Sequence, residues 1–484
     1  MSGIGHYARM APEATAIVTA GSVTTFAELD ERQRSLGGLL ADLGVRRGDR
    51  IAVLAHNRPE LLEITGGALR CGIIPVPVSP LLTPRETRYL LEDSGARWLF
   101  ADRSFPVHPG LEGVVTFGDA YERAVTEASL AKGVADVALG RPMHYTSGTT
   151  GQPKGVWVEP HDAEQASAIL DDFRRLWGLT SDDVFLGCAP LSHSAPHRFA
   201  LRTLETGGTL VLQAGFAADE ALAAIELFGV TSSFMVPTHL ERILALGERT
   251  LRRHDLSTMR LLVHGGAPIR EATKRKVLEL FPPGSVWELY GTTEGQGTRI
   301  RPDEWLRRPG SVGRALPGAA ILILDEDGRL LPAGATGQVW IKDPRAERFR
   351  YWEDDGKTDS AWHVGAFTAG DLGHLDGEDY LYLTGRAADT IISGGVNVYP
   401  EEVELVLLEH PSIVEAAVYG IEHPDLGEQV AASIVLSDRS ELDRDELVGW
   451  VRRRLAGPKR PRQLRIVRSL PRTPTGKLLR RPPD

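Results

Sequence analysis

Cysteine is scarce in this sequence, and long uncharged apolar runs are missing. Cys71 and Cys188 are its only cysteines, which excludes a disulfide framework and is typical of a reducing compartment. The most apolar stretch, residues 61–78, contains Glu63, Arg70 and two prolines, so it does not predict a membrane span. No basic segment followed by an apolar run opens the chain, which argues against a secretory signal. These absences predict a soluble cytoplasmic protein.

The sequence also lacks an excess of positive charge. Its net charge is -10, from 55 lysines and arginines against 65 acidic residues, which argues against a general nucleic-acid binder. Hydrophobic residues make up 42% and charged residues 25% of the chain, as in ordinary globular proteins. Because 484 residues exceed what one hydrophobic core usually supports, the length predicts at least two domains.

Residues 1–140 alternate between strand and helix patterns. Short apolar runs predict strands over 50–55, 72–78 and 97–101, and apolar periodicity predicts helices over 26–43, 61–71 and 85–94. Thr24 or Thr25 would cap the first of these helices. Strands that alternate with helices imply right-handed crossovers and a largely parallel sheet. Residues 106–139 carry little pattern and are expected to form a surface connection.

The same alternation continues after residue 180. Strands are predicted over 183–190, 209–212, 231–236 and 259–263, and a helix over 218–228. The last two strands end in turns at residues 237–239 and 264–268. Open α/β sheets bind ligands at the carboxyl ends of their strands, so both turns are candidate site segments.

One loop is rich in glycine and hydroxyl groups: Tyr145-Thr-Ser-Gly-Thr-Thr-Gly-Gln-Pro-Lys-Gly155. Its glycines allow the backbone to approach a ligand closely, and its lysine supplies a compact positive charge. The residues that would contact the ligand are Thr146, Ser147, Gly148, Thr149, Thr150, Gly151 and Lys154. Strand candidates over 142–145 and 156–158 flank the loop, so a polyphosphate site is favoured over a flexible linker. It is not the common P-loop, because the lysine precedes the final glycine and a β-like segment follows.

This order of residues resembles the phosphate loop of the adenylate-forming superfamily, which includes acyl-CoA synthetases, peptide-synthetase adenylation domains and luciferases. The resemblance implies an α/β fold with a large N-terminal domain of α/β layers and mostly parallel sheets, over residues 1–388. It also implies a small, mobile α+β C-terminal domain over residues 389–484, with a hinge near Asp389. In this second part, strands are predicted over 413–419 and 430–436 and a helix over 445–455.

The segment Tyr290-Gly-Thr-Thr-Glu294 is similar to the superfamily's second signature. The resemblance implies that Tyr290 stacks on adenine, that a threonine of the segment meets the α-phosphate, and that Glu294 binds Mg²⁺. Gly291, Thr292 and Thr293 are all expected to bind the nucleotide. Magnesium prefers hard oxygen ligands and takes few of them from protein, which suits a single carboxylate. The nearby turn at Gly265, Gly266 and Ala267 is expected to bind the nucleotide as well.

Asp371 and Arg386 resemble the pair that binds the ribose hydroxyls in this superfamily. A carboxylate that bridges vicinal hydroxyls is sound chemistry for ribose recognition. The chain departs from the family pattern at one position, where Ala369 stands in place of the usual threonine before the glycine. The loss of one hydroxyl is expected to have a modest effect.

The C-terminal part carries features of both half-reactions. Gly394 and Gly395 belong to the loop that, by resemblance, meets the incoming thiol, and Lys477 would contact the carboxylate and the α-phosphate. Attack on ATP builds negative charge that a positioned cation stabilises. A local basic group is either a solvated face or a site for the phosphates of coenzyme A; it consists of Arg452, Arg453, Arg454, Lys459, Arg460 and Arg462.

The acyl pocket gives a partial indication of substrate. Amino-acid-activating relatives carry an aspartate for the α-amine, but Ser194 stands at that place and no acidic residue lies between Asp183 and Glu205. A buried, unpaired ammonium costs on the order of several kcal/mol, so a fatty, aryl or polyketide-like acid is favoured. His193 either gates the acyl pocket or is a core histidine.

The motifs together predict an ATP-dependent carboxylate ligase. It would form an acyl-adenylate with release of pyrophosphate and then an acyl-CoA thioester, using ATP, Mg²⁺ and coenzyme A, with Lys477, Thr293, Glu294 and His193 in catalysis. An alternative is a stand-alone adenylating enzyme that serves a carrier protein, an amine or another nucleophile, or that activates an unusual acid such as nitrite. A non-catalytic scaffold is disfavoured because Lys154, Asp371 and the catalytic residues are present. Neither a nucleic acid nor a membrane is an expected partner, and a homodimer is left open.

Overall fold

The structure, a computed structural model, describes residues 2–102, 105, 110–146, 153–344, 348–393, 396–424, 426–437, 443–473 and 478–482. The chain divides into two compact units, one formed by Met1–Pro309 with Arg345–Ser360 and the other by Gly310–Pro344 with Ala361–Asp484. The boundary predicted near Asp389 lies inside the second unit and stays a prediction. Some predicted site residues lie outside the described residues: Ser147, Gly148, Thr149, Thr150, Gly151, Gly394, Gly395 and Lys477.

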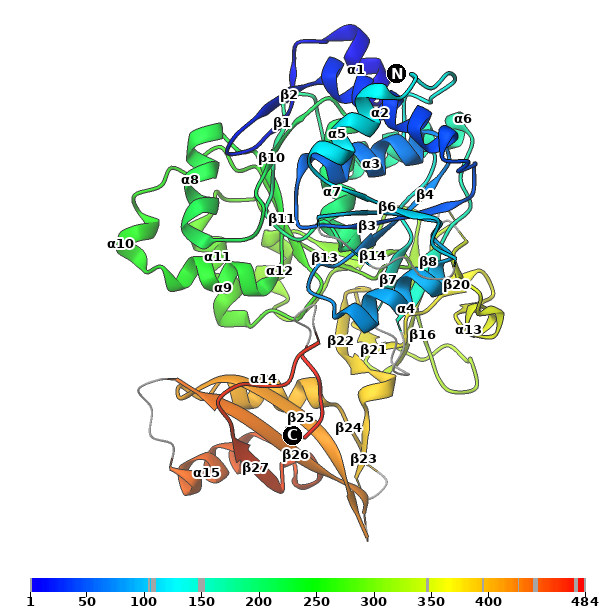
Figure 1. Cartoon of the computed structure of the whole chain (residues 1–484). Coiled ribbons are helices and arrows are strands. Elements are labelled where there is room, and N and C mark those ends of the chain that lie inside the picture. The colour runs from blue at the N-terminus through cyan, green and yellow to red at the C-terminus, as the bar shows by residue number, and fades with distance from the viewer. Residues whose placement is uncertain are drawn as a thin grey trace. The chain divides into compact units, whose positions relative to one another are not determined.

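A large, mostly parallel sheet runs through the first unit (Figure 1). In order across the sheet its strands are β14 (Gln296–Ile300), β13 (Val286–Gly291), β12 (Leu261–Gly265), β11 (Ser232–Met235), β9 (Val184–Gly187), β10 (Thr209–Leu212), β1 (Thr15–Val18) and β2 (Val23–Thr25). Neighbours from β13 to β1 are parallel, β14 pairs antiparallel with β13, and β2 pairs antiparallel with β1. The predicted parallel α/β layer is thereby confirmed.

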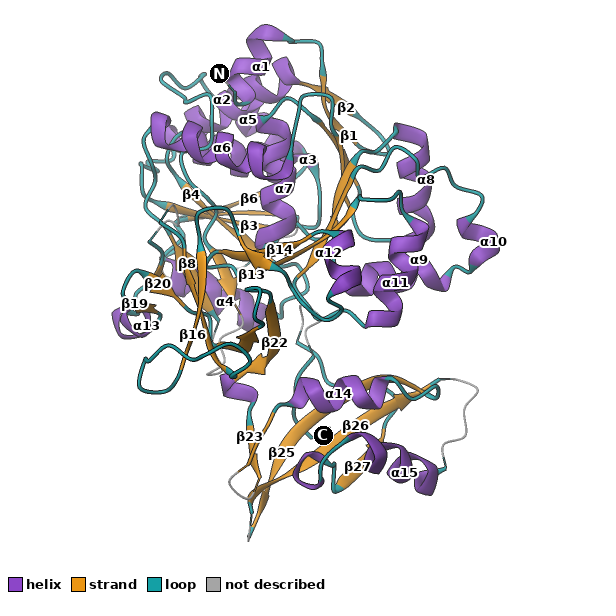
Figure 2. Ribbon diagram, turned by 180° about the vertical axis from the view of Figure 1, so that it is seen from behind, coloured by secondary structure: helices purple, strands orange, loops and turns teal. Residues whose placement is uncertain are grey.

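Successive residues of these strands face two different cores, as expected for a parallel sheet that is buried on both sides. In β11, Phe234 joins the core that contains α7 (Ser194–Glu205), whereas Met235 joins the core that contains α8 (Ala218–Phe228). Figures 1 and 2 show α8, α9 (Pro237–Ala245) and α11 (Glu271–Leu280) together on one face of the sheet. Other helices of the first unit are α1 (Ile4–Met10), α6 (Ala163–Trp177), α10 (Glu248–Leu251), α12 (Pro302–Arg307) and α13 (Asp355–Ser360).

A second, fully parallel sheet of the first unit has the order β4 (Ile74–Val78), β3 (Arg50–Leu54), β5 (Trp98–Ala101) and β6 (Gly113–Thr116). Its helices are α2 (Phe26–Asp42), α3 (Pro59–Arg70), α4 (Pro84–Ser94) and α5 (Asp119–Glu127). These elements confirm the strands and helices predicted for residues 26–101. Thr25 caps α2 as predicted, since its hydroxyl accepts from the Glu28 N–H and the Glu28 carboxylate accepts from the Thr25 N–H.

The surface connection predicted over residues 106–139 is wrong, because β6 and α5 lie within it. The strand has four residues and begins with glycine, and the helix has nine residues. Only Tyr121 and Val125 form the buried face of this helix. One apolar pair four residues apart is too short a pattern to indicate a helix from the sequence.

A small antiparallel sheet holds the predicted phosphate loop. Its order is β18 (Arg350–Tyr351), β8 (Lys154–Trp157) and β7 (His144–Thr146). Tyr145 pairs with Gly155 and Thr146 pairs with Lys154, so the predicted loop joins two strands of a hairpin. Strand β18 adds to the other edge of β8, with Tyr351 opposite Val156.

The second unit contains two sheets. One has the order β19 (Trp362–His363), β20 (Ala366–Phe367), β17 (Gly337–Lys342), β21 (Asp371–Leu375) and β22 (Leu381–Arg386), with β16 (Ala320–Leu324) also on β17. The other has the order β24 (Val396–Val398), β23 (Ile391–Ser393), β26 (Gly427–Leu436) and β25 (Ile413–His423), with β27 (Gln463–Ile466) also on β26. The unit also includes β15 (Arg314–Ala315) and the short helices η1 (Ala387–Asp389) and η2 (Gly457–Lys459).

Two helices cover one face of the C-terminal sheet (Figure 2). Val403 and Leu407 of α14 (Pro400–Leu408) and Leu447 and Val451 of α15 (Arg444–Arg454) share a core with Val430, Ala432 and Ile434 of β26. The strands and the helix predicted over residues 413–455 are therefore confirmed.

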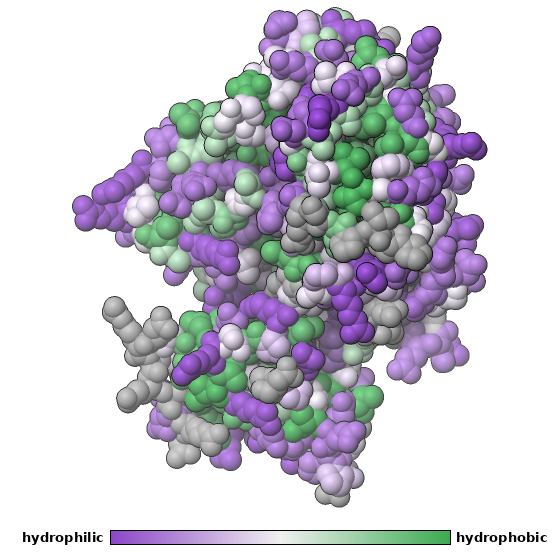
Figure 3. Space-filling view, viewed as in Figure 1, coloured by the Kyte–Doolittle hydropathy of each residue, from purple (hydrophilic) through white to green (hydrophobic). Residues whose placement is uncertain are grey.

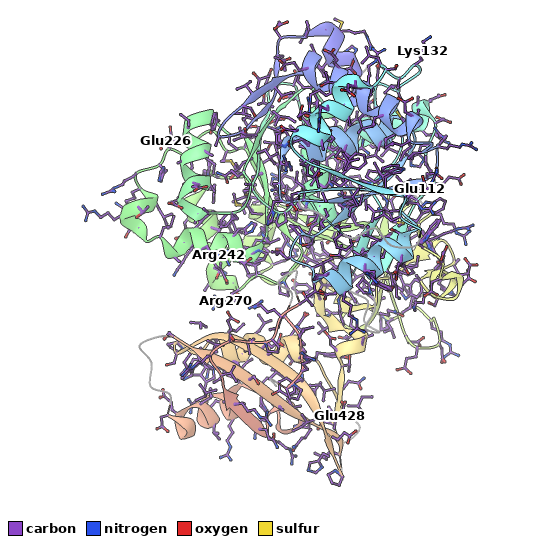
Figure 4. All side chains as sticks on the ribbon, viewed as in Figure 1. Glu112, Lys132, Glu226, Arg242, Arg270 and Glu428 are labelled. Carbon is purple, nitrogen blue, oxygen red and sulfur yellow. The ribbon has the colours of Figure 1, made fainter. Side chains whose placement is uncertain are left out.

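Charged side chains lie at the periphery of the first unit, where Figure 3 shows hydrophilic residues. Figure 4 labels four exposed examples, Glu112, Lys132, Glu226 and Arg242. No helix within the described residues is long and apolar enough to cross a membrane.

Candidate active site

The predicted α-phosphate and metal residues lie in a tight turn between β13 and β14. The Thr292 N–H donates to the Gly295 carbonyl at 2.8 Å, which closes the turn. A Cβ atom on Gly291 would lie 3.0 Å from that carbonyl oxygen, so a side chain there would strain the turn. The turn follows the carboxyl end of β13, the edge at which open α/β sheets bind ligands. It therefore presents Thr292, Thr293 and Glu294 as one group.

Two features of this turn fit a bound phosphate. Thr292 Oγ1 is buried and has no hydrogen-bond partner among the described residues, and a phosphate oxygen would supply one. Arg141 donates from Nη1 to the Thr293 carbonyl at 3.0 Å and from Nη2 to the Glu294 carbonyl at 3.3 Å. This arginine fixes the backbone of the turn and adds a positive charge beside it. No motif in the sequence pointed to Arg141.

The predicted turn after β12 lies beside the turn after β13, because the two strands are parallel neighbours. Gly265 is the register partner of Leu289, one residue before Tyr290. A Cβ on Gly265 would lie 2.3 Å from the Leu289 carbonyl oxygen, so no other residue fits there. Gly266 has a φ of +82°, which also favours glycine. The structure thus brings Gly265, Gly266 and Tyr290 to one edge of the sheet.

The predicted metal ligand and the predicted phosphate lysine meet at one tyrosine. Glu294 is 6% exposed, and its Oε1 accepts a hydrogen bond from the Tyr351 hydroxyl at 2.8 Å. Lys154 Nζ lies 4.7 Å from the centroid of the Tyr351 ring. Burial and the neighbouring Lys357 lower the pKa of Lys154, and Asp354 and Glu294 oppose this shift. A buried carboxylate offers the oxygen ligand that Mg²⁺ prefers, and a neighbouring ammonium group suits the charge of a polyphosphate.

Both ends of the predicted phosphate loop are anchored by tyrosines. The Tyr145 hydroxyl donates to Asp93 Oδ2 at 2.5 Å, and the Tyr89 hydroxyl donates to the Pro153 carbonyl at 3.0 Å. Burial and Asp93 raise the pKa of Tyr145, which keeps this phenol a hydrogen-bond donor at neutral pH. The anchors fix where the loop leaves β7 and where it enters β8.

The N-terminus of α7 approaches the same turn. Ser194 Oγ lies 3.5 Å from Thr293 Oγ1. His193 precedes the helix and is exposed rather than a core residue, although the surrounding protein lowers its pKa by desolvation. The buried histidine of this segment is His197, whose Nε2 lies 3.2 Å from Thr65 Oγ1 and whose ring stands edge-on to His144.

The predicted ribose pair lies in the second unit. Arg386 Nε is 3.2 Å from Asp371 Oδ1, and the two residues are register partners in β22 and β21. Next to Ala369, Thr368 Oγ1 accepts a hydrogen bond from the Gly370 N–H at 3.1 Å, which orders the chain just before Asp371. The modest effect expected from Ala369 stays a prediction.

The predicted basic group is partly engaged within the protein. Lys459 Nζ lies 2.6 Å from Glu402 Oε1, and Arg454 lies 3.4 Å from Glu409 and stacks over Trp450 at 3.5 Å. Arg460 donates to the Leu455 carbonyl at 2.8 Å. Arg452, Arg453 and Arg462 are exposed.

A threonine-rich turn and a buried carboxylate follow a strand of the α/β sheet, and Tyr351 links that carboxylate to the small sheet that holds the glycine-rich hairpin. This arrangement is typical of an adenylate-forming enzyme. The family model of the AMP-binding enzyme matches residues 5–348, and that of the AMP-binding enzyme C-terminal domain matches residues 402–477. The chain belongs to the AMP-binding enzyme family.

Known relatives cover almost the whole chain. A feruloyl-CoA synthase from Amycolatopsis sp is 34% identical, over 98% of this chain and 96% of its own. The solved O-succinylbenzoate coenzyme A synthetase from Bacillus subtilis, in complex with ATP and magnesium, has a TM-score of 0.86 at 29% identity and covers 99% and 98% of the two chains. An amide bond synthetase from Marinactinospora thermotolerans has a TM-score of 0.82 at 31% identity, over 98% and 97%.

These relatives confirm the predicted fold class and activity. The protein is an ATP-dependent, AMP-forming acid–thiol ligase that makes an acyl-adenylate with release of pyrophosphate. Its cofactors and co-substrates are ATP, Mg²⁺ and coenzyme A.

Proposed function

We propose that the protein activates an aryl carboxylic acid and transfers the acyl group to coenzyme A. The observation that carries the proposal is the contact between Ser194 and Thr293, whose hydroxyl oxygens lie 3.5 Å apart. At this place a hydroxyl stands where an amino-acid-activating enzyme would need a carboxylate for the α-amine. An α-ammonium would therefore be buried without a counter-charge, at a cost on the order of several kcal/mol.

The resemblance to feruloyl-CoA synthase and to O-succinylbenzoate coenzyme A synthetase supports an aromatic acid. In the first half-reaction, a carboxylate oxygen of the acid attacks the α-phosphorus of ATP. The bond from that phosphorus to the bridging oxygen of the β-phosphate breaks, and pyrophosphate leaves. Mg²⁺, when bound, neutralises charge on the phosphate oxygens.

The chain's own residues hold the reactants in this proposal. Tyr290 stacks on the adenine, and the hydroxyls of Thr292 and Thr293 donate to the α-phosphate. Lys154 meets the outer phosphates, and Glu294 holds the metal ion. Positioning and fixed positive charge are the main contributions that a protein makes to phosphoryl and nucleotidyl transfer.

Three further roles complete the two half-reactions. Asp371 and Arg386 bind the ribose hydroxyls, and Lys477 contacts the carboxylate and the α-phosphate. The segment after residue 388 then turns about Asp389, which withdraws Lys477 and brings Gly394 and Gly395 to the thiol. His193 gates the acyl pocket, and the exposed Arg452, Arg453 and Arg462 receive phosphates of coenzyme A.

The test is a pyrophosphate-release screen with the full-length protein. The panel holds hydroxycinnamic, benzoic and arylacetic acids, fatty acids and the standard amino acids, each with and without coenzyme A. We expect pyrophosphate from ATP with an aryl acid before any thiol is added, and continued turnover with coenzyme A. Release of ADP and orthophosphate, or activity confined to amino acids, would overturn the proposal.

A second candidate differs only in the acceptor. The resemblance to an amide bond synthetase, at 31% identity over nearly the whole chain, supports an amine as a second acceptor beside the thiol. The same screen decides between them when coenzyme A is replaced by a panel of primary amines. An amide formed faster than the thioester would select the amine.

A further inference from the structure

Tyr351 contacts both the Glu294 carboxylate and the Lys154 ammonium group, which have different roles in the proposed function. Its hydroxyl donates to Glu294 Oε1 at 2.8 Å, and its ring face lies 4.7 Å from Lys154 Nζ. Its side chain is itself buried, with 7% of the residue exposed. The phenol thus contacts the carboxylate through its hydroxyl and the ammonium group through its ring face. A carboxylate and an ammonium group attract each other strongly where water is largely excluded.

The backbone fixes this ring from several sides. Tyr351 lies in β18 opposite Val156 of β8, and the Trp352 N–H donates to the Gly155 carbonyl at 2.8 Å. The Tyr351 N–H donates to Thr358 Oγ1 at 3.0 Å, and the Phe349 ring packs edge-on at 5.4 Å. A side chain held this way on two edges is preorganised, which is the property needed to orient other groups.

Each contact has a distinct chemical effect. A hydrogen bond to one carboxylate oxygen fixes the rotation of the Glu294 side chain and leaves Oε2 to face a cation. Among the described residues, no other hydrogen bond reaches this carboxylate. The ring face attracts the Lys154 ammonium group without neutralising it, as cation–π contacts do. Desolvation lowers the pKa of Lys154, so such a contact helps to keep the lysine charged.

We propose that Tyr351 is a positioning residue that keeps Glu294 open to Mg²⁺ and Lys154 open to phosphate by preventing the two side chains from pairing. The inference rests on the roles proposed above for Glu294 and Lys154. It predicts that loss of the hydroxyl weakens metal binding more than it weakens binding of either organic substrate.

The test compares Tyr351→Phe and Tyr351→Leu with the wild type. For Tyr351→Phe we expect about a tenfold rise in the Mg²⁺ concentration that gives half-maximal pyrophosphate release, the usual effect of losing one hydrogen bond to a charged group. The KM for the carboxylic acid should stay unchanged, and kcat should recover at saturating Mg²⁺. Tyr351→Leu also removes the ring and should raise the KM for ATP at least tenfold.

A second readout is independent of turnover. Binding of Mn²⁺ in the presence of a non-hydrolysable ATP analogue, measured by electron paramagnetic resonance, should weaken about tenfold in Tyr351→Phe. In a Glu294→Gln background, the same tyrosine change should have little further effect on Mn²⁺ binding, because the carboxylate it orients is gone. Mn²⁺ binding tests the role of Tyr351 even if no acid in the panel is activated. Failure of the proposed function and failure of this inference can therefore be told apart.

Tyr121→Phe is the matched control. Its hydroxyl donates to Glu63 Oε2 at 3.0 Å in a buried tyrosine–glutamate pair between α5 and α3. The Tyr121→Phe variant should lose stability as Tyr351→Phe does, but its pyrophosphate release should depend on Mg²⁺ concentration as in the wild type. Wild-type metal affinity in Tyr351→Phe, or an activity loss that is the same at every Mg²⁺ concentration, would overturn the proposal. So would an undiminished effect of the tyrosine change in the Glu294→Gln background.

Discussion

Arg480 Nη1 lies 2.6 Å from Asp389 Oδ2, and this ion pair joins the C-terminal segment to the predicted hinge residue. The same guanidinium lies 3.1 Å from Glu401 and 2.9 Å from Glu404, both in α14. The Arg480 side chain is 17% exposed, whereas that of Arg472, another ion-paired arginine near the C-terminus, is 40% exposed. One cation thus holds three carboxylates together, three residues after Lys477.

Replacing Arg480 should impair adenylation by releasing the segment that carries Lys477. In Arg480→Ala the three carboxylates lose their shared counter-charge and repel one another. We expect single-turnover pyrophosphate release to slow by about tenfold to a hundredfold, the typical effect of a misplaced catalytic group. Arg480→Lys keeps the charge but not the forked geometry, so it should fall between the alanine variant and the wild type.

Arg472→Ala is the control for Arg480. Arg472 pairs with Glu415 at 2.8 Å, but both side chains are about two-fifths exposed. An exposed ion pair contributes at most about 1 kcal/mol, so this variant should stay within about twofold of the wild type. Equal losses in both arginine variants would mean that the Asp389 contact has no special role.

Lys477 should serve the first half-reaction and not the second. It lies outside the described residues, and its role is carried by the resemblance. Lys477→Ala should slow acyl-adenylate formation by about two to three orders of magnitude, as when one preorganised charge donor is lost. Acyl-adenylate supplied from outside should still be converted to thioester at a rate close to that of the wild type.

Single-turnover kinetics of both half-reactions on one preparation would check this prediction. Lys132→Ala, at an exposed site of the first unit, is the control for the removal of a lysine. An equal loss of rate in both steps would show that Lys477 has a structural role, or that the segment after residue 388 does not turn between the two half-reactions. Wild-type rates in both steps would show that it is an ordinary surface lysine.

The parts of the site that could be predicted are those that neighbours in sequence create. The turn at Tyr290–Glu294, the phosphate hairpin and the cap at Thr25 each depend on residues within a few positions of one another. Local patterns of this kind constrain the backbone directly, so these features can be recognised from the sequence alone. The periodic elements of the parallel sheets were predictable for the same reason.

The contacts that could not be predicted link distant parts of the chain. Tyr351 reaches Glu294 across 57 positions, and Arg141 reaches Thr293 across 152 positions. Neither residue lies in a motif or in a periodic apolar pattern. Each can be assigned to the site only after the fold has brought the two parts of the chain together. The short β6 and α5 escaped prediction because their few buried residues give no repeat.

A buried ion pair on β13, the strand that leads into the turn at residues 291–295, should be costly to break. Lys274 of α11 contacts Glu288 of β13, and the two residues are 1% and 6% exposed. Burial lowers the pKa of Lys274 and raises that of Glu288, and their mutual attraction opposes both shifts. Glu288→Gln leaves an uncompensated ammonium group, which should destabilise the protein by about 3–5 kcal/mol.

Thermal unfolding of single and double variants would measure this effect. Lys274→Met with Glu288→Leu removes both charges and should recover most of the lost stability. On the same helix, Arg275 and Glu271 form an exposed pair at 2.6 Å, so Arg275→Gln should cost at most about 1 kcal/mol. A Glu288→Gln variant as stable as Arg275→Gln would contradict the prediction.

His197 should make the folded protein sensitive to acid. It is 1% exposed, and burial lowers its pKa to about 4, whereas a histidine in an unfolded chain has a pKa of about 6.5. Between these values the unfolded chain binds a proton that the folded protein does not. Stability is therefore lost as the pH falls from about 6.5 towards 4, by about 1.4 kcal/mol per pH unit for this histidine.

His197→Gln should remove this contribution. The glutamine can keep the hydrogen bond to Thr65 but loses the edge-on contact with His144, so the variant should be less stable at pH 7.5. At pH 5.0 its deficit relative to the wild type should have shrunk by about 2 kcal/mol, because only the wild type is penalised by proton uptake at this position on unfolding. Urea unfolding at several pH values between 7.5 and 5.0 gives the difference directly. The exposed His363→Gln is the control for the change of histidine to glutamine. A deficit that stays constant with pH, or that grows in acid, would show that His197 is already protonated in the folded protein.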